Sequence, residues 1–144
     1  MATDIKELSR RILEEVWNQQ NLDAVDEMIA PNFVQHDAQS PLAVRGIDAY
    51  KQFVRYYLNA FPNCHFTVED QISEGQMVAT RWTVTSTHTG NLGDIPATGR
   101  RTSATGISWS RIENGKFVES WTNWDTLGML QQLGIMPAPA QEAA

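Results

Sequence analysis

The amino-acid sequence predicts an α+β fold, with helices first and an antiparallel β-sheet after them. Apolar residues recur at steps of three and four up to about residue 61, and alternating patterns with two tight-turn signals follow. No linker or internal repeat divides the 144 residues, and 42% hydrophobic with 19% charged residues is ordinary globular composition. Helices followed by a run of antiparallel strands indicate one α+β domain. We place it at residues 1–136 and expect the Ala/Pro-rich tail 137–144 to be mobile.

Three helices are expected in the first part of the chain. Thr3 is the predicted N-cap of the first, which runs through residues 5–16 with its apolar side chains on one face. A short second helix covers residues 22–29, and residues 33–37 then lead into a loop around a proline. The third helix, residues 46–61, is long and rich in aromatic residues.

The remainder of the chain is expected to form strands and a last short helix. The expected segments, in order, are strands 66–72 and 77–87 joined at Glu74-Gly75, a Gly/Pro-rich loop over 90–99, two strands joined at Asn114-Gly115, and a helix over 127–133. Asn-Gly is the strongest of these turn signals, because both central positions of a type I′ turn need φ above zero.

The strand after the Asn-Gly turn predicts a ligand pocket. Counting outward from that turn pairs Ser108 with Trp121 and Ala104 with Asp125. Paired residues share a face, so Trp121, Asn123 and Asp125 are expected on one side, opposite small residues. Large groups facing small ones leave room for a ligand, and Asp125 is the acid beside it.

The first hairpin adds a charged candidate. With Glu74-Gly75 as its two-residue loop, Val68 pairs with Arg81, and Asp70 joins Arg81 on an otherwise apolar face. Buried charges are costly unless they are paired or meet a polar cavity. Arg81 is therefore either a pocket residue or an ion-pair partner of a neighbouring acid.

Both faces of the expected sheet are apolar. Trp82, Trp109 and Trp124 fall on the faces opposite the expected pocket. Helices can cover only one side of such a sheet, so the sequence predicts that the exposed tryptophans meet a second copy in a back-to-back homodimer through the outer sheet face.

Composition argues against several classes of partner. A net charge of -6 and a pI near 4.9 are unfavourable for nucleic-acid binding, which needs clustered Lys and Arg. Cys64 is the single cysteine, and neither a signal peptide nor a membrane-spanning apolar run is evident, so we expect a cytoplasmic protein that does not enter membranes. No metal-ligand spacing or Gly-rich phosphate loop appears, and we expect no metal and no other cofactor.

Six short segments carry a resemblance to a known family. They are residues 33–37 (Phe-Val-Gln-His-Asp), 81–82 (Arg-Trp), 87–90, 96–99, 114–119 and 121–125 (Trp-Thr-Asn-Trp-Asp). With these segments in order, the stretch from about Glu15 to Gly134 resembles the SnoaL-like polyketide cyclases, which have the nuclear-transport-factor-like, cystatin-like α+β cone fold. The resemblance implies a curved antiparallel β-sheet wrapped around N-terminal helices, with an internal cavity at the open end.

The resemblance also implies a reaction. The aspartate at the position matching Asp125 would act as general acid/base in an intramolecular aldol ring closure of a polycarbonyl, polyketide-like molecule, without metal or nucleotide. Characterised members also use a histidine on the preceding strand, where this chain has Ser108-Trp109-Ser110-Arg111. An enolate formed next to a carbonyl needs a cation or hydrogen-bond donor at its oxygen. Arg81 and His36 are the candidates.

Further residues are expected to line the substrate pocket. They are Trp17, Tyr50, Phe53, Trp121, Asn123 and His88, the last only if a β-bulge turns it inward.

Two alternative functions remain open at this level. One is an epoxide hydrolase or dehydratase on the same cone, in which Arg81, Asp125 and Asp70 would form the required base and two acids. The other is a non-catalytic small-molecule-binding module, in which Asp125 serves only as the N-cap of the last helix. A hydrolase needs a second acid near Asp125, and a cyclase needs one acid in an apolar cavity.

Overall fold

The computed structural model describes residues 4–39 and 43–137, so Thr3 and all of the tail after Pro137 lie outside the described residues. The helices are α1 (Ile5–Arg11), η1 (Ile12–Asn18), η2 (Leu22–Ala24), α2 (Val25–Met28), α3 (Gly46–Ala60) and α4 (Thr126–Gln132). The strands are β1 (Ile29–His36), β2 (Val44–Arg45), β3 (His65–Glu74), β4 (Met77–Thr87), β5 (Arg101–Glu113) and β6 (Lys116–Trp124).

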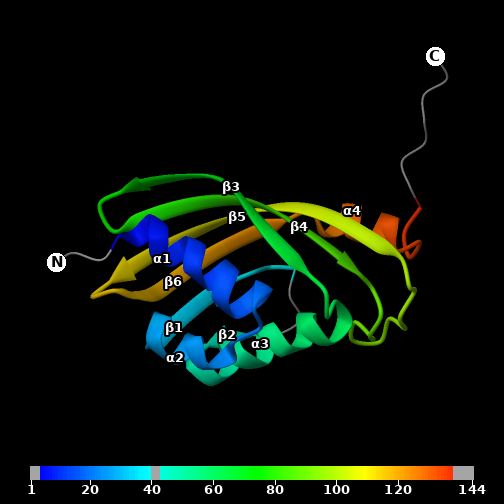
Figure 1. Ribbon diagram of the computed structural model, residues 1–144, viewed down its shortest axis with the longest axis horizontal. Helices are drawn as coiled ribbons and strands as arrows, with labels where there is room; N and C mark the ends of the chain where they lie inside the picture. Colours follow the sequence, from blue (N-terminus) through cyan, green and yellow to red (C-terminus); the bar gives the residue numbers. More distant parts are fainter. Residues whose placement is uncertain (1–3, 40–42, 138–144) are drawn as a thin grey trace, which may run out of the picture.

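The six strands form one curved sheet in the order β2-β1-β6-β5-β4-β3. All neighbouring strands run antiparallel except β1 and β6, which are parallel. Helices α1, α2 and α3 lie on the concave side of the sheet, and α4 follows β6 at one end (Figure 1). This is the α+β arrangement predicted from the sequence, with its sheet curved around the N-terminal helices.

Helix α1 begins at Asp4. The Asp4 carboxylate accepts backbone N–H bonds from Lys6 at 3.0 Å and Glu7 at 3.3 Å, so it satisfies two of the donors that a helix start leaves unpaired. The cap is thus one residue later than the predicted Thr3. The helix widens into the π-helical turn η1, and α3 and α4 fall within one residue of their predicted ranges.

The strand β1 was predicted as the lead-in to a loop. Residues 29–36 instead form a strand that pairs with β6, for example Gln35 with Ser120. The expectation was wrong because the partner strand lies at the other end of the chain, and no local turn announces the pairing. Along β1, Phe33 and Gln35 face the helices while His36 faces outward.

A β-bulge in the last hairpin changes which residues face the helices. Asn114 and Gly115 form the predicted turn with φ of 53° and 74°, and Ile112 pairs with Phe117 as expected. A bulge next to Ile112 then shifts the register by one residue. A shift of one residue moves every later side chain to the other face.

The shift reverses the faces predicted for the end of β6. Trp121 pairs with Trp109 and Asn123 with Ile107 on the outer face, whereas Trp124 faces the helices. The sequence predicted Trp121 and Asn123 on the inner face and Trp124 on the outer face. The placement of all three was wrong.

The first hairpin is also displaced from its predicted register. Its turn is Gly75-Gln76, one residue beyond the predicted Glu74-Gly75, and a bulge lies between Val68 and Asp70. Asp70 therefore pairs with Arg81 on the outer face, and Trp82 points inward, where only 5% of it is exposed.

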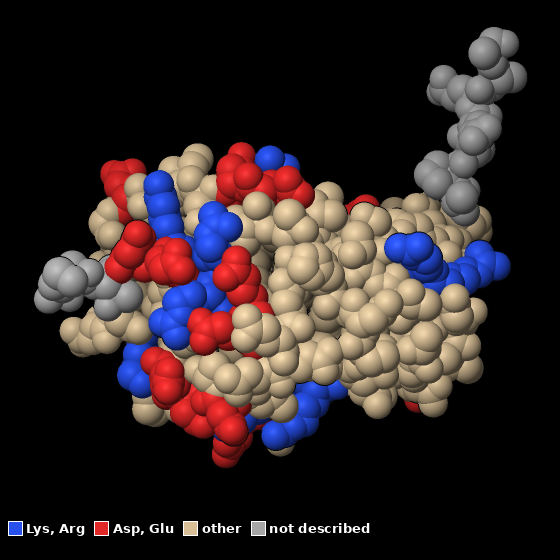
Figure 2. All heavy atoms as spheres, viewed as in Figure 1, with Lys and Arg blue, Asp and Glu red and all other residues tan. Residues whose placement is uncertain are grey.

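The core fills most of the space between the helices and the sheet. Val16, Val25, Met28, Ile29 and Val54 have no exposed surface, and Phe33 has 1%. None of the helices in residues 4–39 and 43–137 is long and apolar enough to cross a lipid bilayer. Figure 2 shows acidic and basic side chains interspersed over the end that carries α1 and α2, so this face has no extended basic patch.

Candidate active site

A cavity lies between the helices and the concave face of the sheet. Its volume is about 130 Å³, roughly ten times the room that one buried water needs. One wall is aromatic and comes from η1, α3 and β1, with Trp17, Tyr50, Phe53, Tyr57 and Phe33. The opposite wall belongs to the sheet and carries hydroxyl groups between apolar side chains. This combination suits a flat, largely apolar ligand that bears oxygen atoms.

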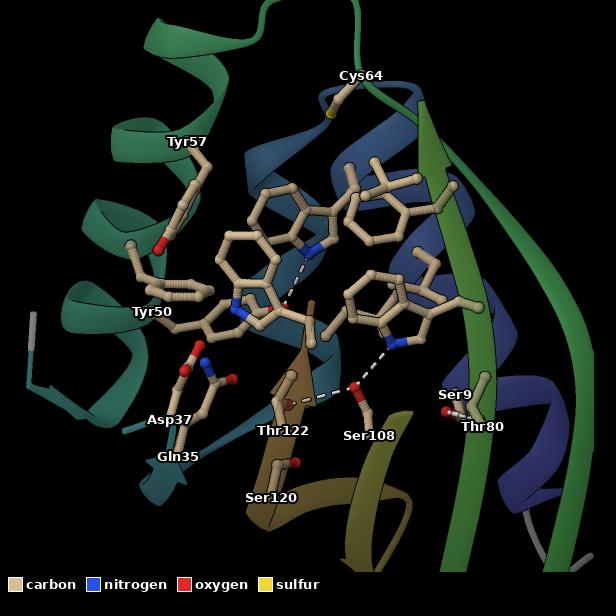
Figure 3. Close-up of a pocket in the computed structure, with 18 of the residues that line it drawn as sticks. Ser9, Gln35, Asp37, Tyr50, Tyr57, Cys64, Thr80, Ser108, Ser120 and Thr122 are labelled. Carbon is tan, nitrogen blue, oxygen red and sulfur yellow. Dashed lines mark hydrogen bonds between the residues drawn. The ribbon is translucent and has the colours of Figure 1, made fainter. Parts of the chain in front are cut away.

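Asp37 supplies the acid of this cavity. Among the described lining residues it is the only carboxylate, and none of those residues is Lys, Arg or His. Figure 3 shows the side chains of Asp37 and Gln35 next to each other and pointing into the cavity, with the hydroxyl of Tyr57 directed toward the same region. The Gln39 backbone N–H donates to Asp37 Oδ1 at 3.0 Å, which orients the carboxylate. The cavity therefore has one acid in mainly apolar surroundings.

Two other titratable groups of the cavity stay protonated at neutral pH. Burial raises the pKa of Tyr50 to about 12, and the hydrogen bond donated by Trp17 Nε1 to its hydroxyl, at 3.2 Å, offsets part of this increase. Burial also raises the pKa of the Cys64 thiol to about 11. Neither group is therefore a base at neutral pH.

Asp125 lies outside the cavity. It is exposed and forms the N-cap of α4, where its Oδ1 accepts the Gly128 backbone N–H at 2.9 Å. The bulge in the last hairpin explains the difference from the prediction, because it turns Trp124 inward and places Asp125 beyond the end of β6. Asp125 thus has the N-cap geometry that was the alternative prediction for this residue.

His36 and Arg81 also lie away from the cavity, on the outer face of the sheet. His36 Nε2 is 2.7 Å from Glu119 Oε2, and the His36 ring stacks on Trp121 with 5.2 Å between centroids. Arg81 Nε donates to Asp70 Oδ1 at 3.0 Å, and both side chains are more than half exposed. Neither residue lines the cavity.

The six predicted pocket residues divide into two groups. Trp17, Tyr50 and Phe53 line the cavity. Trp121 and Asn123 lie on the outer face, and His88 has no exposed surface but is not part of the cavity wall. His88 Nδ1 instead accepts the Thr98 backbone N–H at 3.2 Å.

Hydroxyl groups form hydrogen-bonded pairs across the sheet wall. Ser108 and Thr122 are 3.2 Å apart, Ser110 and Ser120 are 2.8 Å apart, and Ser86 and Thr102 are 2.9 Å apart. All six line the cavity. Trp82 Nε1 additionally donates to Ser108 Oγ at 3.1 Å (Figure 3).

The sequence carried a signal for part of this site. Residues 33–37 were recognised as a motif, and alternation from a buried Phe33 places Gln35 and Asp37 on the inner face and His36 outside. The same alternation is inconsistent with His36 as a pocket residue. Thr122 and Trp124 had no such signal, because their direction depends on the bulge.

Side chains in the described residues do not gather into a metal site: no group of three or more His, Cys, Asp or Glu is close enough to hold an ion.

Comparison with known proteins identifies close relatives. The family model described as SnoaL-like polyketide cyclase matches residues 7–133. Aklanonic acid methyl ester cyclase DnrD from Streptomyces peucetius is 33% identical, and the match covers 99% of this chain and 97% of that protein.

Solved structures show the same fold. A putative polyketide cyclase from Acidithiobacillus ferrooxidans has a TM-score of 0.83 and 29% identity, covering 93% of this chain and 96% of the other. Wild-type IdmH, a putative polyketide cyclase from Streptomyces antibioticus, has a TM-score of 0.78 and 31% identity, covering 92% of this chain and 99% of the other.

Proposed function

Because this chain belongs to the SnoaL-like polyketide cyclase family, we propose that it closes a ring in a polyketide-like polycarbonyl molecule, with Asp37 as the general acid/base. The single observation that carries the assignment of Asp37 is its position: it is the only carboxylate among the described residues that line an otherwise mainly apolar cavity. A cyclase that works through one acid needs this arrangement.

The proposed reaction is an intramolecular aldol addition. The Asp37 carboxylate removes a proton from a carbon next to a carbonyl, and the resulting enolate carbon attacks a second carbonyl carbon of the same molecule. One carbon–carbon bond forms, the attacked C=O becomes an alkoxide, and the proton held by Asp37 returns to that oxygen to give a hydroxyl group. Substrate and product are isomers, and one side chain serves first as base and then as acid.

The proposal calls for no metal ion and no nucleotide, because every proton transfer is assigned to a protein side chain. The aromatic wall, including Trp17 and Phe53, holds the carbon skeleton and excludes water from the enolate. Aklanonic acid methyl ester, on which the relative DnrD acts by name, is a suitable first substrate for an assay.

The residues that the hydrolase alternative requires do not lie together. Its three residues, Arg81, Asp70 and Asp125, are divided between an outer-face ion pair and the cap of α4. An activated water would need an acid and a second charged group at one place. The geometry therefore favours the cyclase over the hydrolase.

The test compares two aspartates in one assay. Wild type, Asp37→Asn and Asp125→Ala are incubated with aklanonic acid methyl ester, with EDTA present and no nucleotide added, and the isomeric product is measured by chromatography and mass spectrometry. Loss of a general acid/base should lower kcat for Asp37→Asn by about 100-fold or more. Asp125→Ala should keep kcat within about threefold and instead lose about 1 kcal/mol of stability as a missing N-cap.

The opposite pattern would overturn the assignment. If Asp125→Ala loses turnover and Asp37→Asn keeps it, Asp125 is the acid/base despite its position. If wild type binds the ester without forming any isomer, and a panel of related polycarbonyl esters gives the same result, the chain is a binding module.

A further inference from the structure

Ser108 and Thr122 form a hydroxyl pair of the cavity wall that has a third, fixed partner. The indole N–H of Trp82 donates to Ser108 Oγ at 3.1 Å, and Ser108 Oγ is 3.2 Å from Thr122 Oγ1. The three side chains come from β4, β5 and β6, which are neighbours in the sheet. Trp82 is almost fully buried, so the direction of its N–H is set by packing.

A count of protons shows that this pair presents a donor to the cavity. Two hydroxyls carry two protons, and the bond between Ser108 and Thr122 uses one of them, whichever residue donates. The Trp82 N–H occupies an acceptor position on Ser108 and uses no hydroxyl proton. Within the described part of the chain no further partner of either hydroxyl is found, so one O–H remains available whichever way the pair is oriented.

Burial distinguishes this pair from its neighbours. Ser86, Thr102, Ser110 and Ser120 are each less than 9% exposed, whereas Ser108 and Thr122 are partly exposed. The exposed surface of this pair lies on the cavity wall. The remaining O–H of the Ser108–Thr122 pair is therefore accessible to a ligand.

The position of the pair matches that of the proposed base. Gln35 pairs with Ser120 and His36 with Trp121, so Asp37, the next residue, comes level with Thr122. Figure 3 shows Thr122 between Asp37 and Ser108. Neighbouring strands are about 4.8 Å apart. When a base and a donor are one or two strands apart, the base can lie within about 3 Å of a substrate C–H group. The donor can then lie within about 3 Å of the oxygen of the adjacent carbonyl.

We infer that Ser108 and Thr122, positioned by Trp82, form the hydrogen-bond donor for the substrate oxygen on which negative charge develops when Asp37 removes the proton. This inference rests on the proposed function and supplies the donor that His36 and Arg81 cannot provide. Trp82 is a positioning residue, because it acts through Ser108. The hydroxyl pair would take a carbonyl oxygen of the substrate and hold it more strongly as an enolate oxygen.

The kinetic test removes both hydroxyls, because the loss of one leaves the other proton free to donate. In the double variant Ser108→Ala/Thr122→Val, kcat for aklanonic acid methyl ester should fall about 100 to 1000-fold, with a smaller change in KM. Thr122→Ser keeps the hydroxyl and should keep kcat within about threefold. Thr105→Val, which removes a hydroxyl from the exposed face of β5 outside the cavity, is the matched control and should behave like wild type.

A binding test separates this inference from the proposed function. Quenching of tryptophan fluorescence gives the affinity of wild type and double variant for 9,10-anthraquinone and for anthracene, which has the same three rings without oxygen. Wild type should prefer the quinone by several-fold to about tenfold, as expected for one hydrogen bond, and the double variant should lose that preference. A wild type without the preference, or a double variant that keeps it or retains full kcat, overturns the inference even if the enzyme is a cyclase.

Discussion

At the scale of single residues, the buried His88 makes the stability of the folded protein depend on pH. It has no exposed surface and lies against Phe61 with 5.2 Å between ring centroids. Burial lowers the pKa of His88 below its usual 6.5, although a backbone hydrogen bond at Gly90 opposes part of the change. The unfolded chain therefore binds a proton at this residue at a higher pH than the folded chain does. Stability is fully present above pH 6.5 and is lost as the pH falls through the folded pKa.

This gives a pH-dependent expectation. The Tm of wild type should fall as the pH is lowered from 7.5 to 5, and His88→Gln, which cannot take up the proton, should show a smaller fall. The measurement is thermal unfolding followed by circular dichroism across that pH range. His65→Gln removes an exposed histidine and should keep the wild-type slope. Equal slopes for wild type and His88→Gln would contradict the role of His88.

Single residues also show where sequence reasoning is strong and where it fails. The aromatic cavity residues Tyr50 and Phe53 follow from helical spacing, because a regular helix fixes the side that each residue faces. His36 and Asp37 are adjacent in sequence, and alternation from Phe33 tells them apart only once residues 29–36 are known to be a strand. That strand pairs with β6, far along the chain, so no local turn signal reveals it.

At the scale of elements, β5 has a glycine at the point where two tryptophans cross it. A Cβ atom on Gly106 would lie 2.4 Å from the ring of Trp82 and 2.8 Å from Cβ of Trp124. The glycine allows both indoles to pack over the strand and to line the cavity. Glycine is required at this position because a side chain would not fit, and not because of the backbone conformation, since φ of Gly106 is not positive.

Gly106→Ala should therefore cost about 1 to 3 kcal/mol in the free energy of unfolding, as overpacking of a core does. It should also alter the near-ultraviolet circular dichroism that reports on the indoles. Urea unfolding measures the cost. Thr105→Ala changes the neighbouring exposed residue and should lie within about 0.5 kcal/mol of wild type. A Gly106→Ala variant as stable as wild type would show that Trp82 has room to move.

Elements also explain the extent of the fold prediction. Helices α1, α3 and α4 and both hairpins were predicted because each has a local signal, such as apolar periodicity or the Asn-Gly turn. The bulges between Val68 and Asp70 and beside Ile112 have no comparable signal. Each one reverses the faces of the residues beyond it, so the correctly predicted hairpin strands still gave the wrong placement for Arg81 and Trp121.

At the scale of the whole molecule, the outer face of the sheet carries an apolar patch formed by Ile107, Trp109 and Trp121, which are 49%, 52% and 38% exposed. Trp82 and Trp124, which were predicted on this face, are turned inward. Asn123 lies beside the patch. A flat apolar sheet face of this kind is suited to an identical face related by two-fold symmetry, and we propose the back-to-back homodimer with this patch at its centre.

Sedimentation analysis tests the proposed dimer. Wild type should sediment as a dimer at roughly ten micromolar, corresponding to a dissociation constant in the micromolar range or below. The double variant Trp109→Glu/Trp121→Glu should be a monomer, because two charges would be buried without partners. Ile72→Glu alters an exposed apolar residue on β3, outside the patch, and should remain dimeric. A wild type that stays monomeric at ten times this concentration would rule out the dimer.

The parallel pairing of β1 with β6 has a consequence for how the chain folds. The two hairpins join strands that follow each other directly, so they can form early from local contacts. Ile29 and Phe117, by contrast, meet across most of the chain, and contacts of such long sequence separation form slowly. Asp37 reaches its place beside Thr122 only through this pairing. During synthesis on the ribosome, the proposed catalytic centre is thus assembled only after β6 has been translated.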